Sequence, residues 1–251
     1  MDLRLTAAGL VVGTIAGMSG IGGSALLAPI LILFFGVKAA IAVGTDLIYS
    51  VPMKALAAFA HIRQGTVDRG VVKLLALGGI PGALIGLATF ALVRAHVSEA
   101  QLEHALRHAI GIVILCAAAT LVVTFWIRRR PAATAAPPAV TVAIGAVVGF
   151  LVALTSIGSG SITLPLLLLA LPAISLRKLI GSEIVFAALM VPIAAAGHVA
   201  FADVDWPMAL SLTAGAVPGA YLGARLSARL GDLSLRPAVI GILAFAGFKL
   251  L

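Results

Sequence analysis

The chain has 251 residues, of which 62% are hydrophobic and 10% charged, and its mean hydropathy is +1.19. A soluble domain carries about 25% charged residues, so this composition excludes a soluble globular protein and indicates an integral membrane protein. The net charge of +8 is no sign of nucleic-acid binding, because basic residues at the ends of apolar segments report membrane orientation.

The first predicted element is an apolar segment that a glycine-rich break divides into residues 3–18 and 24–36. The break runs from Gly17 to Ser24, and three longer apolar segments follow near 39–60, 70–93 and 106–127. A membrane span needs about 20 residues. We therefore interpret the broken segment as a hairpin of short helices that ends near the middle of the membrane. Two tilted spans joined by a tight turn are the alternative.

The second half repeats this plan after Arg128 to Arg130 and a proline-rich linker. A segment over 140–155 breaks, continues over 160–171, and is followed by segments near 179–200, 207–228 and 235–250. Residues match at an offset of 136 or 137: Gly13 with Gly149, Pro29 with Pro165, His61 with His198, Asp68 with Asp205, and Pro81 with Pro218. The sequence predicts an all-α polytopic membrane protein with a first repeat over 1–130, a cytoplasmic linker over 131–139 and a second repeat over 140–251. Each repeat is expected to be a broken-helix hairpin plus three transmembrane helices.

Charge placement predicts that the two repeats have inverted topology. With Arg128 to Arg130 in the cytoplasm, eleven of the 17 basic residues become cytoplasmic and five lie outside, while Lys54 lies within a span. The loop near residue 65 is basic, whereas the equivalent loop near residue 203 contains Asp203 and Asp205 and no base. Equivalent loops are therefore expected on opposite sides of the membrane.

The two breaks are expected to face each other across the inverted repeat, and together they are the predicted anion site. A helix that begins at a break directs free N–H groups and the positive end of its dipole toward the break, and neighbouring hydroxyls add neutral donors. The alternative is that the glycines only allow close helix packing. The candidate substrate-binding residues are Lys54 and those of the breaks: Ser19, Gly20, Ile21, Gly22, Gly23 and Ser24 in the first, and Thr155, Ser156, Gly158, Ser159, Gly160 and Ser161 in the second.

Three charged residues lie inside or at the edge of predicted spans. Lys54 is a candidate for binding the anion or a counter-ion, with snorkelling or a structural ion pair as the alternative. Asp46 and Glu183 are equivalent acids that each follow a glycine near a predicted helix start. The favoured interpretation is a first-turn acid that complements the helix dipole. A proton-coupling carboxylate or a partner for buried cations is the alternative.

Two histidines and two further acids recur at the ends of equivalent segments. His61 and His198 close the same helices as Asp46 and Glu183, and we expect them to be interfacial, with a proton-linked role open. Asp68 and Asp205 each follow a turn and are predicted to cap the next helix.

Several motifs together resemble one known family. They are Gly20-Ile21-Gly22-Gly23 followed by Pro29, Ala42-Val43-Gly44-Thr45 before a long helix, His61 with Gly65-Thr66-Val67-Asp68, the stretch from Gly78 to Gly86, and a degenerate second copy. In this order they resemble the TauE/SafE family of sulfite exporters, also called TSUP, over essentially the whole chain. Ser24 and Ser159 interrupt the fuller glycine run that the family carries. The resemblance implies a carrier of small sulfur oxyanions or organosulfonates in the bacterial inner membrane, with sulfite as the leading substrate.

Other functions are less consistent with the sequence. A larger sulfonate or a carboxylate would require a dedicated arginine, and no arginine lies deep in a predicted span. An enzyme would require a catalytic or metal cluster, but three of the five histidines gather around one loop. The one cysteine, Cys116, permits no intrachain disulfide and is no basis for a metal or redox site. A non-transporting scaffold is the remaining alternative. The expected partners are sulfite or a related small anion, the lipid bilayer and a second copy of the chain, with no cofactor, metal or nucleic acid.

Overall fold

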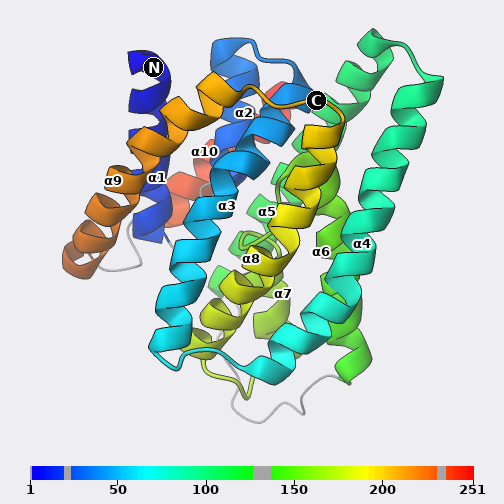
Figure 1. The fold of residues 1–251 in the computed structure, drawn as a ribbon. Coiled ribbons are helices and arrows are strands. Elements are labelled where there is room, and N and C mark those ends of the chain that lie inside the picture. The colour runs from blue at the N-terminus through cyan, green and yellow to red at the C-terminus, as the bar shows by residue number, and fades with distance from the viewer. Residues whose placement is uncertain (1, 20–23, 127–136, 231–235) are drawn as a thin grey trace.

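In the computed structural model the described residues, which are all except 1, 20–23, 127–136 and 231–235, form helices and connecting turns (Figure 1). The first half contains α1 (Leu3–Ser19), α2 (Ser24–Phe35), α3 (Ala39–Arg63), α4 (Arg69–His96) and α5 (Glu99–Trp126). The second half contains α6 (Pro138–Thr155), α7 (Thr163–Ala170), α8 (Leu176–Ala200), α9 (Trp206–Leu230) and α10 (Arg236–Leu250). Within the described ranges, α3, α4, α5, α6 and α8 are long and apolar enough to cross a membrane. The predicted all-α, multi-pass architecture is confirmed.

One predicted boundary is wrong by about two turns. Helix α5 begins at Glu99, not near residue 106. The Ser98 Oγ accepts a hydrogen bond from the Gln101 N–H (3.3 Å), and the Gln101 Oε1 accepts one from the Ser98 N–H (3.0 Å). This reciprocal capping box begins the helix in a polar stretch that precedes the apolar segment. A prediction from hydropathy alone therefore places the helix start too late.

The pieces on either side of the second break differ in length. Helix α7 has 8 residues, which at 1.5 Å per residue cannot cross about 30 Å of hydrocarbon. Helix α6 has 18 residues and is long enough to cross. The expectation that both pieces are too short to span is therefore wrong for α6, because its helix starts at Pro138 and reaches Thr155 without interruption.

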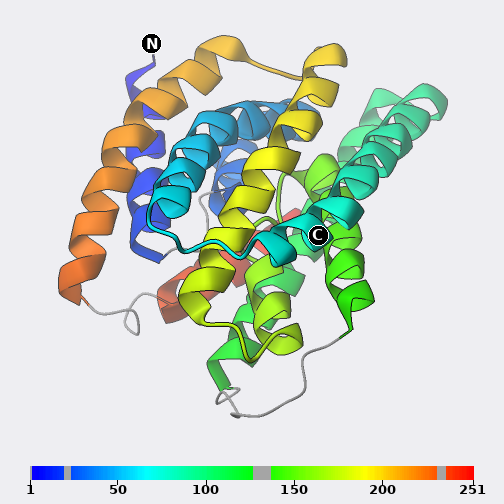
Figure 2. The same cartoon turned by 60° about the horizontal axis from the view of Figure 1, so that its bottom comes forward.

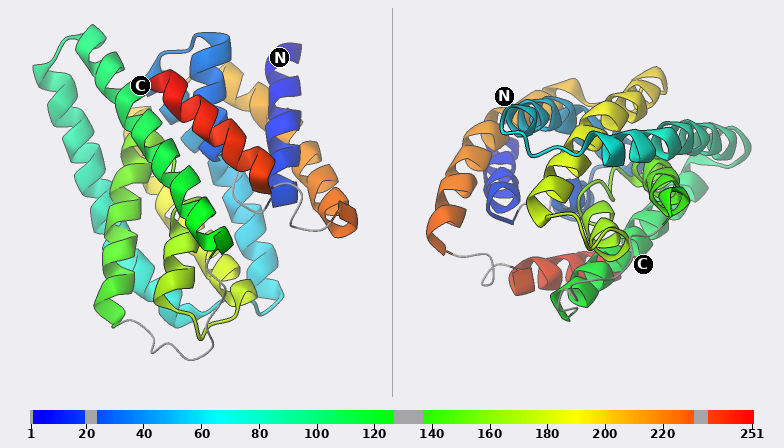
Figure 3. Two further views of the ribbon diagram at one scale, coloured as in Figure 1. Left: turned by 180° about the vertical axis from the view of Figure 1, so that it is seen from behind. Right: turned by 90° about the horizontal axis from the view of Figure 1, so that it is seen from below.

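Each half packs mainly against the other half. Helix α1 lies against α9 on one side of the molecule, α6 lies against α4 on the opposite side, and α3 and α8 cross between them (Figure 2). Helices α5 and α10 cross behind this centre (Figure 3). In Figure 1, α3 runs away from the end where both chain termini lie, and α8 runs back toward that end.

Glycines allow the two outer pairs to approach very closely. A Cβ added at Gly78 of α4 would lie 1.9 Å from the carbonyl oxygen of Val142 on α6. A Cβ added at Gly215 of α9 would lie 1.9 Å from the carbonyl oxygen of Thr6 on α1. No side chain fits at either position, so the backbones of each pair are in direct contact, as at small-residue crossings of membrane helices.

The turns after α3 and α8 are held in matching ways. The Asp205 N–H donates to the Thr45 hydroxyl (3.1 Å), and the Asp68 N–H donates to the Ser182 hydroxyl (2.8 Å). The Asp68 carboxylate accepts from the N–H groups of residues 70 and 71, and Asp205 accepts from the Met208 N–H. The predicted capping roles of both aspartates are confirmed. Each turn is thereby attached to the central helix of the other half.

Candidate functional site

The second break is a tight, buried turn between α6 and α7. Helix α6 ends at Thr155, and the next residue, Ser156, adopts a left-handed conformation with φ 60° and ψ −1°. Gly158 and Gly160 also have positive φ values of 127° and 99°, which glycine adopts without steric cost. Residues 155–161 are all buried, so the chain reverses direction inside the protein.

Side chains satisfy part of the break's backbone. The Thr155 hydroxyl donates to the Leu151 carbonyl oxygen (2.7 Å) and accepts from the Ile157 N–H (3.2 Å). The Thr163 hydroxyl donates to the Gly158 carbonyl oxygen (3.0 Å). The Ser161 hydroxyl is fully buried and has no hydrogen-bond partner among the described residues. Because buried polar groups are normally paired, an unpaired hydroxyl here makes the break a candidate ligand site.

The first break cannot be described in the same way. Gly20, Ile21, Gly22 and Gly23 lie outside the described residues, as do the side chains of Ser19 and Ser24. That the two breaks face each other therefore stays a prediction.

Asp46 lies deeper than its sequence context predicts. Helix α3 begins at Ala39, so Asp46 is about two turns inside it, and Glu183 is equally far inside α8. The interpretation of both acids as first-turn residues is wrong, because α3 begins at Ala39 and α8 at Leu176, and each acid lies seven residues further along its helix. The Asp46 side chain is fully buried; its Oδ2 accepts a hydrogen bond from the Ser156 Oγ (2.7 Å), and its Oδ1 has no partner in the described part of the chain.

Lys54 and Glu183 lie together in the interior between α3 and α8. The Lys54 Nζ is 3.5 Å from the Glu183 Oε1, and the two side chains are 12% and 4% exposed. This is an ion pair, but its separation is longer than a charge-assisted hydrogen bond. Lys54 thus has a fixed counter-charge on the other half of the molecule.

The two equivalent histidines have different surroundings. His61 is partly exposed, and its Nδ1 lies 2.8 Å from the Thr66 Oγ1. His198 is fully buried, and its Nε2 lies 2.9 Å from the Ala153 carbonyl oxygen near the end of α6. The expectation that both lie at the membrane interface stays a prediction; within the protein, the ring of Phe90 and the end of α6 cover His198.

Sequence analysis missed the ion pair between Arg94 and Asp203. The Arg94 Nη1 lies 2.7 and 2.6 Å from the two carboxylate oxygens of Asp203, which is 7% exposed on its side chain. Asp203 Oδ2 also lies 3.8 Å from the His198 Nδ1. Arg94 lies in the last turn of α4, and Asp203 lies between α8 and α9. No local spacing in the sequence could therefore have indicated their contact.

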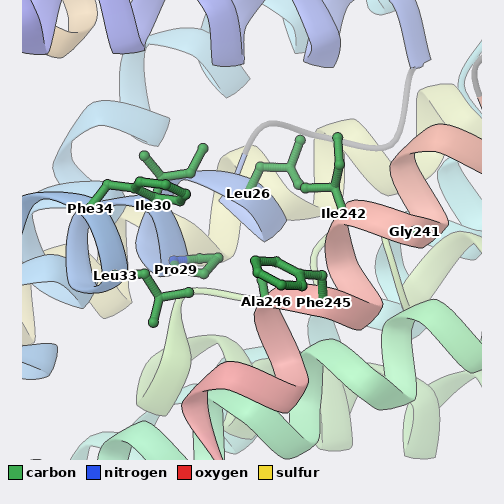
Figure 4. Close-up of a pocket in the computed structure, with 9 residues that line it drawn as sticks. All are labelled: Leu26, Pro29, Ile30, Leu33, Phe34, Gly241, Ile242, Phe245 and Ala246. Atoms are coloured by element: carbon green, nitrogen blue, oxygen red, sulfur yellow. The ribbon is translucent and has the colours of Figure 1, made fainter.

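A pocket between α2 and α10 is not suited to an anion (Figure 4). Its lining side chains are all apolar: Leu26, Pro29, Ile30, Leu33, Phe34, Gly241, Ile242, Phe245 and Ala246. In the described ranges, no three His, Cys, Asp or Glu side chains come together as metal ligands. The polar, buried break at 155–161 remains the better candidate site.

Comparisons with known proteins agree on a transporter. The family model of the sulfite exporter TauE/SafE matches residues 5–250. The Bacillus subtilis (strain 168) probable membrane transporter protein YjnA is 35% identical over 258 residues, which cover 100% of both chains. The probable membrane transporter protein YunE of that organism is 27% identical, over 90% of this chain and 87% of its own. The probable membrane transporter protein YdhB, also of that organism, is 24% identical over 96% of both chains. No solved structure matches. These names indicate a membrane transporter rather than an enzyme.

Proposed function

Because the chain belongs to the sulfite exporter TauE/SafE family and is a membrane transporter, we propose that it exports a small sulfur oxyanion, sulfite, from the bacterial cell through the inner membrane. The observation that carries the proposal is the buried break at residues 155–161, where the Ser161 hydroxyl has no partner among the described residues. Helix α7 starts at Thr163, directly after the break, so the positive end of its dipole is directed there.

The surroundings of the break favour a small anion held by neutral donors. Lys54 is paired with Glu183, and Arg94 is paired with Asp203. Arg94 is therefore not free to form the bidentate contact that a larger sulfonate or carboxylate would use, and the point charge of Lys54 already has a partner. Binding through hydroxyls and backbone groups is weak at each point, which suits a carrier that must release its substrate.

We propose that the two halves form an inverted repeat that moves by alternating access. The opposite directions of α3 and α8 support this arrangement (Figure 1). So do the matching hydrogen bonds from Asp205 to Thr45 and from Asp68 to Ser182, which are related by the offset of 137 residues. A repeat of this kind lets one half rock against the other around a central site.

The test is saturable sulfite efflux from proteoliposomes that contain the purified chain. Gly158 has φ +127°, where a valine would be strained, so Gly22→Val with Gly158→Val is expected to abolish efflux. Gly241→Val is the matched control, because no atom lies within 4 Å of an added Cβ there. Normal efflux from the double variant would reject the site. Absence of saturable sulfite flux in the wild type would reject the substrate.

A further inference from the structure

The Asp46 carboxyl group lies at the proposed anion site. It contacts the Ser156 hydroxyl at 2.7 Å, and Ser156 is the residue of the break that directly follows α6. Asp46 is fully buried, and one of its two oxygens has no partner among the described residues. An anion that binds in the break would therefore lie beside this carboxyl group.

The groups around Asp46 do not balance a negative charge. Lys54 of α3 is the charged group that acts on Asp46, and the break contributes the neutral Ser156 hydroxyl. Tyr49, also on α3, is a neutral phenol beside it. Lys54 lies eight residues further along α3, about 12 Å along the helix axis, and is already paired with Glu183 on α8. The turn before α9 contacts the neighbouring Thr45 hydroxyl through the Asp205 backbone N–H, and the Asp205 carboxylate accepts from the Met208 N–H.

An ionised Asp46 and a bound anion would repel each other strongly. The repulsion between two like charges about 4 Å apart, at an effective dielectric constant of about 20, weakens anion binding on the order of a thousandfold. A proton on Asp46 removes this repulsion and converts the carboxylate into a group that can also donate a hydrogen bond. Anion binding and protonation of Asp46 therefore favour each other, as linkage requires.

We propose that Asp46 carries one proton across the membrane with each anion. This inference rests on the proposed function, because it places the anion at the same break. The carboxylate takes a proton from the side on which the anion enters and releases it to the side on which the anion leaves. A monoanion then crosses without net charge, so the membrane potential exerts no force on it. Export proceeds when the product of the internal anion and proton concentrations exceeds the external product.

The experiment measures net charge moved per sulfite in proteoliposomes that contain the full chain, with the potential clamped and the flux followed chemically. In Asp46→Asn, each transported sulfite is expected to carry one more negative charge than in the wild type, because the proton no longer accompanies it. Asp46→Glu is expected to restore the wild-type ratio. Glu99→Gln is the control, since it removes an equal charge from an exposed side chain.

A second measurement does not depend on the variant being folded. In wild-type proteoliposomes at zero potential, a proton gradient is expected to drive sulfite accumulation above that of protein-free liposomes. The inference is overturned if this accumulation is absent while sulfite still flows down its own gradient, or if Asp46→Asn moves the same charge per sulfite as the wild type. Absence of any sulfite flux in the wild type contradicts the proposed function, and this inference with it.

Discussion

Lys54 and Glu183 form a buried ion pair between α3 and α8, and we predict that losing either partner alone costs more stability than losing both. Lys54→Met leaves the Glu183 carboxylate unpaired, and Glu183→Leu leaves the Lys54 ammonium unpaired. The double variant removes both charges and puts apolar side chains of similar volume in their place. The three variants therefore separate the stability lost when one buried charge has no partner from the net contribution of the ion pair to the free energy of unfolding.

The magnitudes follow from the separation and burial of the two groups. At 3.5 Å and an effective dielectric constant of about 20, the attraction is about 5 kcal/mol. The desolvation of two ions offsets most of it, since each loses several kcal/mol of hydration. Each single variant is expected to lose about 3–5 kcal/mol, which corresponds to a fall in melting temperature of about 6–20 °C for a chain of this length. The double variant is expected to lie close to the wild type.

The assay is thermal unfolding of the purified protein in one detergent, read by intrinsic fluorescence. The exposed ion pair between Lys38 and Glu99 is the control, because its side chains are 62% and 77% exposed and surface pairs contribute little. Lys38→Met with Glu99→Leu should leave the melting temperature unchanged. Additive losses in the double variant of Lys54 and Glu183 would refute the reasoning, because they would mean that the two charges do not interact.

Three further predictions concern packing, capping and binding. Gly78→Leu should lower the yield and melting temperature sharply, because its Cβ would lie 1.9 Å from a carbonyl oxygen of α6, whereas Gly241→Leu should not; equal effects would contradict the close crossing. Asp68→Ala should lower the unfolding free energy by about 0.5–2 kcal/mol, because it removes the N-cap of α4; an unchanged denaturation midpoint would refute this. Ser161→Ala should raise the half-saturating sulfite concentration about tenfold or more without lowering the melting temperature, since its hydroxyl has no partner in the described residues; a loss of stability with unchanged transport would indicate a structural role.

The sequence predicts most of the fold because membrane helices can be recognised by the length and hydropathy of their segments. The segments expected near 39–60 and 179–200 are α3 and α8, and the acids expected to cap helices do so. The late start predicted for α5 shows the limit of this signal. Ser98 and Gln101 form a capping box, which is a local sequence motif. A hydropathy average does not detect this motif, because its residues are polar.

The burial of the site could not be predicted in the same way. His198 and Asp203 belong to a cluster that α4, α6 and the turn before α9 complete, and these segments are far apart in the sequence. The start of α3 near residue 39 was predictable, but the burial of Asp46 also depends on the break, whose Ser156 hydroxyl donates to it from a segment 110 residues away. Such properties follow from tertiary contacts, which a single sequence does not contain.

Positions 46 and 183 show that equivalence along the chain does not produce equivalent chemistry. Both acids are buried about two turns inside the central helices. Glu183 has Lys54 as a partner, but the residue equivalent to Lys54 in the second half is Val191, so Asp46 gains no matching lysine. Asp46 instead accepts a hydrogen bond from Ser156 at the break. One acid is neutralised by an ion pair and the other is left beside the proposed anion site, which is the asymmetry that a carrier of one proton per anion requires, because a second free carboxylate would demand a second proton.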